Sequence, residues 1–190
     1  GQAHHALVAD MDDLDALRSR LETHIATVPV QILINNTGGP PGGPAHTAST
    51  DAYLSAFRRH LLAGQVLVQA LLPGMRAAGW GRIVNVVSTS VREPIMGLGV
   101  SNTVRGAVAG WAKTLSRELA ADGITVNNVL PGYTRTQRIA QIVADRAARS
   151  GQSEDAVVAA MQATVPVGRF AEPEETAGVI AFLCSPAAGY

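Results

Sequence analysis

Short apolar runs alternate with longer helical segments along most of this chain. Two parallel strands need a crossover of a dozen or more residues between them, and a helix usually supplies it. Near-continuous apolar strands are typical of a parallel sheet that helices cover on both faces. The alternation therefore predicts an α/β fold with a doubly wound parallel sheet in three layers. The expected strands are HALVA (5–9), VQILINN (30–36), GRIVNVVS (81–88) and ITVNNVL (124–130).

Helices are predicted from apolar periodicity and from residues that begin or end helices. The segment STD (49–51) can cap a long helix that runs towards Met75, with Pro73 in its last turn. No repeat and no linker interrupts the chain, so a single domain over residues 1–190 is expected. The other expected helices lie at about 12–27, 101–121, 136–149, 153–163 and 173–184.

The composition argues against several classes of function. Lys+Arg and Asp+Glu both number 15, so no basic excess favours nucleic acid or an anionic membrane as a partner. We expect no apolar run of membrane-spanning length and no signal peptide. Cys184 is the single cysteine, and His4 and His5 have no metal-ligand spacing to another cluster, so no metal site is predicted. A cytoplasmic protein is the plain expectation.

The ends of the expected strands are polar or rich in glycine. In open parallel sheets, ligands bind beyond the carboxyl ends of the strands. A nucleotide-sized ligand lying across several strands would suit this arrangement. The strand ends are Asp10, Asn35–Gly39, Ser88–Ser90 and Pro131–Thr136.

Four blocks of the sequence resemble consecutive blocks of the short-chain dehydrogenase/reductase family. They are ILINNTGG, GRIVNVVSTS, RGAVAGWAKTLSRELAADGITVNNVLPGYTRT and VGRFAEPEETAGVIAFLCSP, in the family's order and spacing. The chain most resembles the divergent branch similar to 3-oxoacyl-acyl-carrier-protein reductase. The resemblance implies a Rossmann-like dinucleotide-binding domain that uses NAD or NADP.

Against that family, the sequence lacks a first βαβα unit with its glycine-rich turn and a last strand. These residues contain no G-x-G-x-x-G motif. The GGPPGG run is no substitute, because proline has no N–H group to donate to a phosphate. We therefore expect a domain that is incomplete at both ends and cannot by itself build a full dinucleotide site.

The resemblance implies cofactor contacts at the strand ends. The acidic residue after HALVA matches one that contacts the adenine, and NTGG stands where the family has Asn-Ala-Gly. The PGYTRT loop matches the P-G-x-x-x-T loop that holds the nicotinamide. Ordinary turn chemistry is the alternative for each residue alone. The residues implied are Asp10, Asn36, Thr37, Gly38, Gly39, Pro131, Gly132 and Thr136.

The family's catalytic positions are occupied by Ser88, Ser101 and Arg105. Ser88 matches the serine that polarises a carbonyl, although it could also satisfy a backbone group at the strand end. Ser101 stands where the family has the proton-donating Tyr, and Arg105 where it has Lys. A Tyr hydroxyl has a pKa near ~10 that a nearby cation can lower, whereas serine is a poor acid and Arg cannot relay protons.

Three other residues bear on whether the missing acid is replaced. Lys113, the single lysine, is expected to point roughly 80° away from Arg105 around the helix. Tyr133 lies in the loop beside the expected nicotinamide. It could be a replacement acid, or it could be a loop aromatic that packs on a neighbour. His60 aligns with the family's relay Asn, as a proton shuttle or as a satisfied helix histidine.

Two functions from different classes remain open. The first is an NAD(P)-dependent oxidoreductase that transfers hydride to a carbonyl such as a 3-oxoacyl thioester, and the second is a catalytically impaired cofactor-binding or scaffold protein. Apolar helices near 51–75 and 101–121 predict a homodimer or homotetramer. The segment 136–163 resembles the family's variable substrate lid. Its arginines could face an acidic substrate, or they could simply be solvated.

Overall fold

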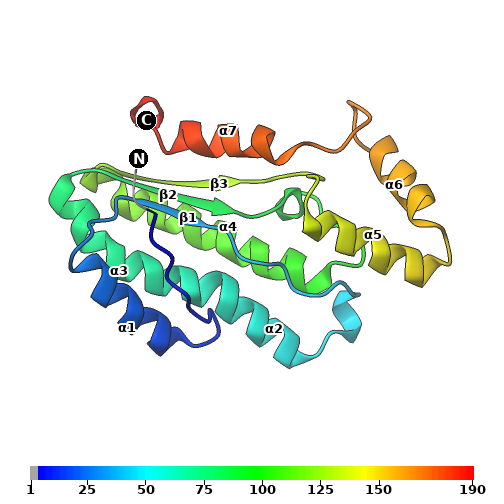
Figure 1. Ribbon diagram of the computed structural model, residues 1–190, viewed down its shortest axis with the longest axis horizontal. Helices are drawn as coiled ribbons and strands as arrows, with labels where there is room; N and C mark the ends of the chain where they lie inside the picture. The colour runs from blue at the N-terminus through cyan, green and yellow to red at the C-terminus, as the bar shows by residue number, and fades with distance from the viewer. Residues whose placement is uncertain (1–3) are drawn as a thin grey trace.

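The computed structural model describes residues 4–190, and its centre is a parallel sheet of three strands. The strands are β1 (Ile32–Asn35), β2 (Gly81–Val86) and β3 (Ile124–Val129), in the spatial order β1-β2-β3. All neighbours are parallel, so each carboxyl end lies at the same edge of the sheet (Figure 1). Three of the four expected strands are thus confirmed, each a few residues shorter than the apolar run that predicted it.

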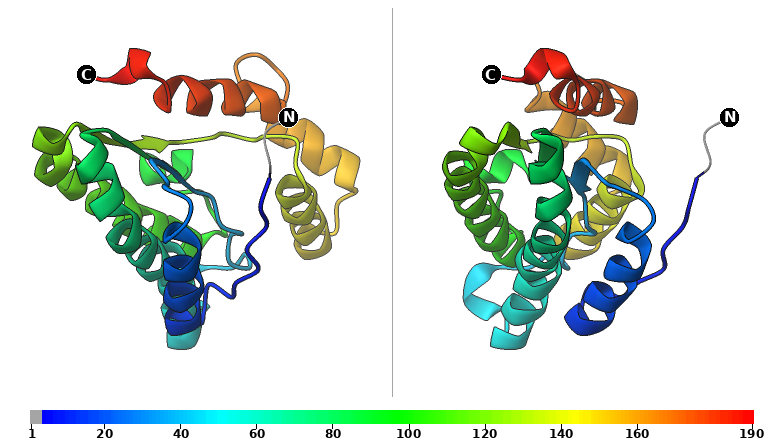
Figure 2. Two further views of the ribbon diagram at one scale, coloured as in Figure 1. Left: turned by 60° about the vertical axis from the view of Figure 1, so that its left-hand side comes forward. Right: turned by 90° about the vertical axis from the view of Figure 1, so that its left-hand side faces the viewer.

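Helices cover both faces of the sheet. The helices are α1 (Leu14–Ile25), α2 (Thr50–Phe57), α3 (Ala63–Ala78), α4 (Gly99–Leu119), α5 (Gln137–Ser150), α6 (Glu154–Ala163) and α7 (Pro173–Leu183). Helices α3 and α4 pack below the sheet, with α1 beside α3, and α7 lies above β2 and β3 (Figures 1 and 2). The three-layer, doubly wound architecture predicted from the sequence is confirmed.

The long helix expected from 49–51 to Met75 is three helical segments in one continuous run. A π-helical turn, η2 (Arg58–Leu62), joins α2 to α3, and α3 continues to Ala78. Pro73 therefore lies inside α3 and not in its last turn. Leu71 and Met75, which flank it, are buried against the sheet. Their burial offsets the hydrogen bond that proline cannot make.

This run also corrects the expectation that no segment has membrane-spanning length. Residues Thr50–Ala78 form 29 helical residues with a mean hydropathy of 1.3 in the most apolar stretch. By length and composition alone, that is enough to cross a membrane. Its buried side packs on α1, α4 and the sheet, as the central helix of a globular core does.

The expected strand at residues 5–9 does not form. This segment is non-helical and unpaired, and most of it is exposed, including Val8 at 79%. A strand gains its ladder hydrogen bonds from a neighbouring strand, and these residues do not pair with β1 or with any other described strand. Their apolar composition was therefore a misleading signal.

A row of asparagines crosses the sheet near its carboxyl edge. Asn35 pairs in register with Asn85, and Asn85 with Asn128. Asn35 Nδ2 donates to Asn85 Oδ1 (2.8 Å), and Asn85 Nδ2 donates to Asn128 Oδ1 (3.2 Å). Because Asn85 is almost fully buried, these bonds satisfy polar groups that would otherwise be costly to bury. The row ties the three strands together immediately below the expected ligand site.

Candidate active site

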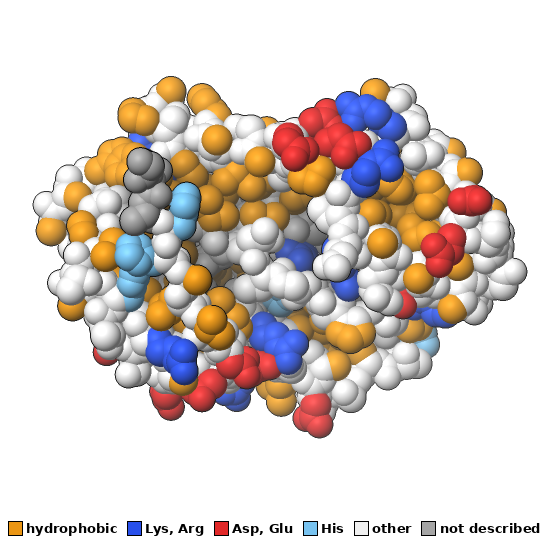
Figure 3. Space-filling model, viewed as in Figure 1, with side chains coloured by type: hydrophobic (Ala, Val, Ile, Leu, Met, Phe, Trp, Pro, Cys, Tyr) orange, Lys and Arg blue, Asp and Glu red, His pale blue; other side chains and the backbone are white. Residues whose placement is uncertain are grey.

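A cavity of about 360 Å³ opens at the carboxyl edge of the sheet. Its walls come from the ends of β1, β2 and β3, the start of α4, one side of α5 and the start of α7. Figure 3 shows the hollow on this face, with Lys or Arg side chains visible inside it. The volume lies within the usual range for small-ligand sites. The polar residues of the wall are Asn36, Ser88, Thr89, Ser101, Arg105, Tyr133, Thr134, Thr136, Arg138, Arg146 and Thr176.

The residues implied in cofactor binding divide into those at the cavity and those elsewhere. Asn36 lines the cavity, as do Pro131, Gly132 and Thr136 of the loop after β3. The structure therefore brings together segments that lie almost 100 residues apart in sequence. Asp10 does not line the cavity. Its carboxylate accepts a hydrogen bond from the Asp12 backbone N–H (2.9 Å) in an exposed turn before α1.

The turn after β1 presents three further predicted residues. Thr37 does not line the cavity, and its hydroxyl contacts His60 Nδ1 at 2.6 Å. Open space surrounds the position that a Cβ atom on Gly38 would occupy. At Gly39 a Cβ atom would lie 3.1 Å from the Arg138 guanidinium. The absence of side chains therefore permits a close approach at both glycines, although at Gly39 the approaching group is Arg138.

Ser88 ends the segment after β2 and lines the cavity. Its Oγ accepts a hydrogen bond from the Ser90 backbone N–H (3.1 Å) and caps the short turn η3 (Thr89–Val91). Ser88 therefore satisfies a backbone group at the end of the strand, and its role at a substrate carbonyl stays a prediction. Because that bond uses an acceptor lone pair, the hydroxyl proton stays free to be donated to a ligand carbonyl in the cavity.

Ser101 and Arg105 lie one turn apart on α4 and both face the cavity. Arg105 Nε donates to Ser101 Oγ (3.3 Å), and Arg105 Nη1 donates to the carbonyls of Val86 (2.9 Å) and Val87 (2.8 Å). The guanidinium is therefore held against the end of β2. Burial, followed by the charge of Arg138, lowers the pKa of Arg105. Ser101 keeps its own proton, but it lacks the acidity of a phenol.

His60 lies in the π-helical turn η2 and is buried, with 9% of its surface exposed. Burial lowers its pKa to about 4, and the positive charges of Arg105, Arg59 and Arg138 add to the effect. The ring is thus neutral near pH 7 and is engaged by Thr37. This geometry favours the satisfied helix histidine over the proton shuttle.

Tyr133 and Lys113 differ in their relation to the cavity. Tyr133 lines the cavity, but its ring packs edge-on against Phe170 with centroids 5.8 Å apart. It belongs to the apolar cluster of α5 and α6, as a packing aromatic would. Lys113 is exposed on α4 and does not line the cavity.

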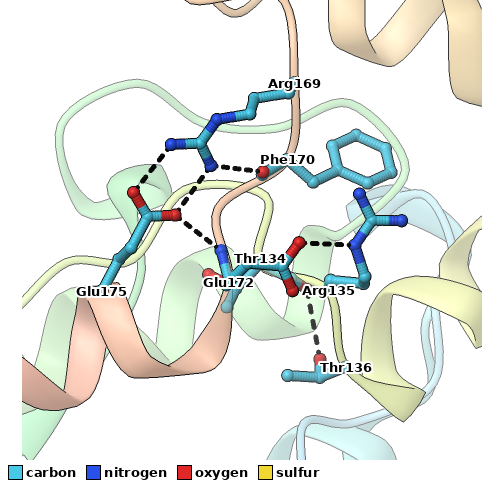
Figure 4. Close-up of polar contacts among 7 residues, drawn as sticks. All are labelled: Thr134, Arg135, Thr136, Arg169, Phe170, Glu172 and Glu175. Carbon is cyan, nitrogen blue, oxygen red and sulfur yellow. Dashed lines mark hydrogen bonds and ion pairs between the residues drawn. The ribbon is translucent and has the colours of Figure 1, made fainter.

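The start of α7 closes one side of the cavity, which the sequence interpretation missed. Arg169 donates to both carboxylate oxygens of Glu175 (2.7 and 2.8 Å), and Arg135 donates to Glu172 (2.9 Å; Figure 4). The Arg169 guanidinium lowers the pKa of Glu175 to about 2. Glu172 and Glu175 form a capping box at the start of α7. The E-P-E-E spacing in the sequence is a recognisable signal for that box.

Comparisons with known proteins find reductases that are similar to this chain in sequence. A family model described as enoyl-(acyl carrier protein) reductase matches residues 2–190. Acetoacetyl-CoA reductase from Rhizobium meliloti (strain 1021) is 33% identical over 162 residues, which is 85% of this chain and 63% of that protein. Acetoacetyl-CoA reductase from Shinella zoogloeoides is 30% identical over 162 residues, 85% of this chain and 63% of that protein.

Solved structures also share the fold. L-sorbose reductase from Gluconobacter frateurii, complexed with NADPH and L-sorbose, has a TM-score of 0.87 at 27% identity, covering 96% of this chain and 70% of that chain. A variant of actinorhodin polyketide ketoreductase with NADPH has a TM-score of 0.88 at 28% identity, covering 95% and 70%. Both hold a nicotinamide cofactor of the predicted class.

The chain therefore belongs to the short-chain dehydrogenase/reductase family. It spans about 62% of the length of the curated relatives that it matches.

Proposed function

We propose that this protein binds NAD(H) or NADP(H) at the cavity and reduces a carbonyl compound such as a 3-oxoacyl thioester, with Ser101 and Arg105 in place of the family's Tyr and Lys. The observation that carries this proposal is the pair's position. It faces the same cavity as Ser88 and the loop after β3. The residues present fit the nicotinamide end of the cofactor, because Asn36, Gly132 and Thr136 surround a cavity suited to a ring and a sugar.

When bound, the cofactor supplies hydride to the carbonyl carbon. Ser88 orients the substrate, since its free hydroxyl proton can be donated to the carbonyl oxygen. Ser101 can donate a second hydrogen bond to the same oxygen. The Arg105 charge stabilises the oxyanion that forms, and its bonds to the Val86 and Val87 carbonyls hold it in place.

Proton transfer is the weak step of this mechanism. Serine is a poor acid, and Arg105 stays charged and cannot relay a proton. Loss of a positioned general acid typically lowers a rate by about 10²–10⁴. We therefore expect the protein to bind the cofactor and to turn over its substrate slowly.

A second function is favoured by a different observation. Two of the three hydrogen bonds that Arg105 donates go to backbone carbonyls, as expected of a structural arginine. On that basis the protein is a cofactor-binding or scaffold protein of the same fold.

Exposed Leu54 and Phe57 on α2 support the predicted homodimer or homotetramer in either case. A cytoplasmic location stays a prediction.

Calorimetric titration of the full-length protein with NADPH and NADH tests binding, and product analysis with acetoacetyl-CoA and simple ketones tests turnover. Binding with slow product formation supports the reductase. Binding with no product over extended incubation supports the cofactor-binding protein, and the absence of binding to either cofactor contradicts the reductase and favours the scaffold.

A further inference from the structure

Within residues 4–190, the three arginines of the cavity lack the carboxylate partner that four arginines at the surface have. Arg59, Arg76, Arg135 and Arg169 each pair with a carboxylate at the surface. Three arginines line the cavity, namely Arg105, Arg138 and Arg146, and the residues that line it include no Asp or Glu. Within residues 4–190, none of these three has a carboxylate within ion-pair distance. The cavity therefore concentrates positive charge without compensation from the protein.

Arg138 reaches across the cavity from the first turn of α5. Its Nη2 donates to the Pro40 carbonyl (2.7 Å), 98 residues away in sequence. The guanidinium also lies over Gly39, where a Cβ atom would come within 3.2 Å of three of its atoms. Arg138 thus joins the turn after β1 to the segment after β3. Its one hydrogen-bond acceptor is a neutral carbonyl, which is a weaker partner for a guanidinium than an anion.

The charge of Arg138 also acts on Arg105. It opposes the charged form of Arg105, which is itself partly removed from water. Two like charges in a partly desolvated cavity repel each other, and an anion placed between them would relieve the repulsion. The planar guanidinium is suited to two-point recognition of carboxylate or phosphate.

We propose that Arg138 and Arg105 form a binding site for an oxyanion group, a carboxylate or a phosphate, and that Arg138 exchanges the Pro40 carbonyl for this group when the ligand enters. The identity of the molecule that carries this oxyanion rests on the proposed function, in which it is either the cofactor or an acidic carbonyl substrate. The oxyanion site itself can be measured without either.

The test is calorimetric titration of the full-length protein with inorganic diphosphate and with malonate at low ionic strength. Wild-type protein is expected to bind at least one of these probes. Arg138→Gln should weaken that binding about tenfold or more, because it removes a charge-assisted contact. Arg138→Lys should weaken it less, since it keeps the charge but loses the planar fork. The matched control is Arg135→Gln, three residues away and paired with Glu172 at the surface, which should stay within about twofold of wild type.

The source of the oxyanion is resolved by adding NADPH. Diphosphate binding that NADPH competes away assigns the site to cofactor phosphate. Malonate binding that persists with NADPH present assigns it to a substrate carboxylate. The proposal is overturned if wild type binds neither probe, if Arg138→Gln and Arg138→Lys both bind as wild type does, or if Arg135→Gln loses as much affinity as Arg138→Gln. A protein that binds the probes but shows no reductase activity would contradict the proposed function alone.

Discussion

Two walls of the cavity differ in the roles that we propose for their residues. The wall formed by the ends of β1 and β3 contains Asn36 and residues of the loop from Pro131 to Thr136, which we propose contact the cofactor. The wall formed by α4 carries Ser101 and Arg105 one turn apart and facing the cavity, where we propose that they stand in place of the family's proton donor and its partner. In this proposal, the residues that bind the cofactor and the residues that donate the proton lie on separate elements of the fold. Proton donation can therefore change while cofactor binding persists.

Restoring the family pair should give the largest effect. Ser101→Tyr combined with Arg105→Lys places a phenol in the cavity beside a cation that lowers its pKa. Turnover with NADPH should rise about 10²–10⁴-fold, measured as the steady-state rate with the best ketone. Tyr133→Phe is the control and should leave the wild-type rate unchanged, because that ring packs on Phe170. An unchanged rate in a double variant that binds NADPH normally would show that proton donation does not limit turnover.

Displacing the α4 wall should have the next largest effect. A Cβ atom on Gly99 would overlap the backbone of Ala45, so Gly99→Ala has to shift the turn that carries Ser101. We expect it to lower the free energy of unfolding by about 3 kcal/mol, measured by chemical denaturation.

Gly106→Ala on the same helix is the matched control. Apart from the adjoining residues and backbone of its own helix, no atom lies within 4 Å of its Cβ position, so Gly106→Ala should raise stability by about 0.5–1 kcal/mol through helix propensity. Equal stability of the two variants would show that α4 does not depend on the close contact at Gly99.

The buried ring of His60, which contacts Thr37 in the turn after β1, predicts a pH dependence of stability. Because burial lowers its pKa to about 4, the unfolded chain binds a proton more readily than the folded protein between pH 6.5 and 4. The stabilisation is complete above pH 6.5 and is lost as the pH falls towards 4. The loss is on the order of 2 kcal/mol, allowing for partial access of water to the ring. His60→Asn should flatten that part of the profile in denaturation curves, whereas a profile equal to wild type would contradict the assignment.

The smallest effect is expected at the exposed ion pairs around α7. Arg135→Gln removes one surface pair with Glu172, which should change the free energy of unfolding by less than about 1 kcal/mol. Thermal melts at low and high salt would check this, since the wild-type contribution should shrink with added salt. A large loss of stability would show that the contact between the Pro-Gly loop and α7 is structurally essential.

Local sequence patterns predicted most of the fold. They failed where an element depends on contacts with residues far away in the sequence. The runs that became β1, β2 and β3 are apolar on both faces, and their alternation with helices settled the parallel sheet. The run at 5–9 has the same composition but no partner strand, and composition does not reveal pairing. The prediction that the helix ends near Pro73 was also wrong. The burial of Leu71 and Met75 stabilises the helix beyond this proline and outweighs its local tendency to end a helix.

The sequence predicted which residues lie at the candidate site better than it predicted the contacts that their side chains make. Spacing along α4 placed Ser101 and Arg105 on one face, and the structure puts both at the cavity. The bond from Arg138 to Pro40 could not be predicted, because it joins segments 98 residues apart through one side-chain conformation. Asp10 was matched to an adenine contact; it lies in an exposed turn outside this cavity, and that role stays a prediction.

The most direct test is a stopped-flow experiment on the full-length protein. A preformed complex with NADPH is mixed with acetoacetyl-CoA, and cofactor fluorescence is followed through a single turnover, beside the Ser101→Tyr and Arg105→Lys double variant. We predict that both proteins bind NADPH and that wild type oxidises it about 10²–10⁴ times more slowly. Oxidation by wild type as fast as that of the double variant, or no binding of NADPH by wild type, would contradict the separation of binding from proton donation.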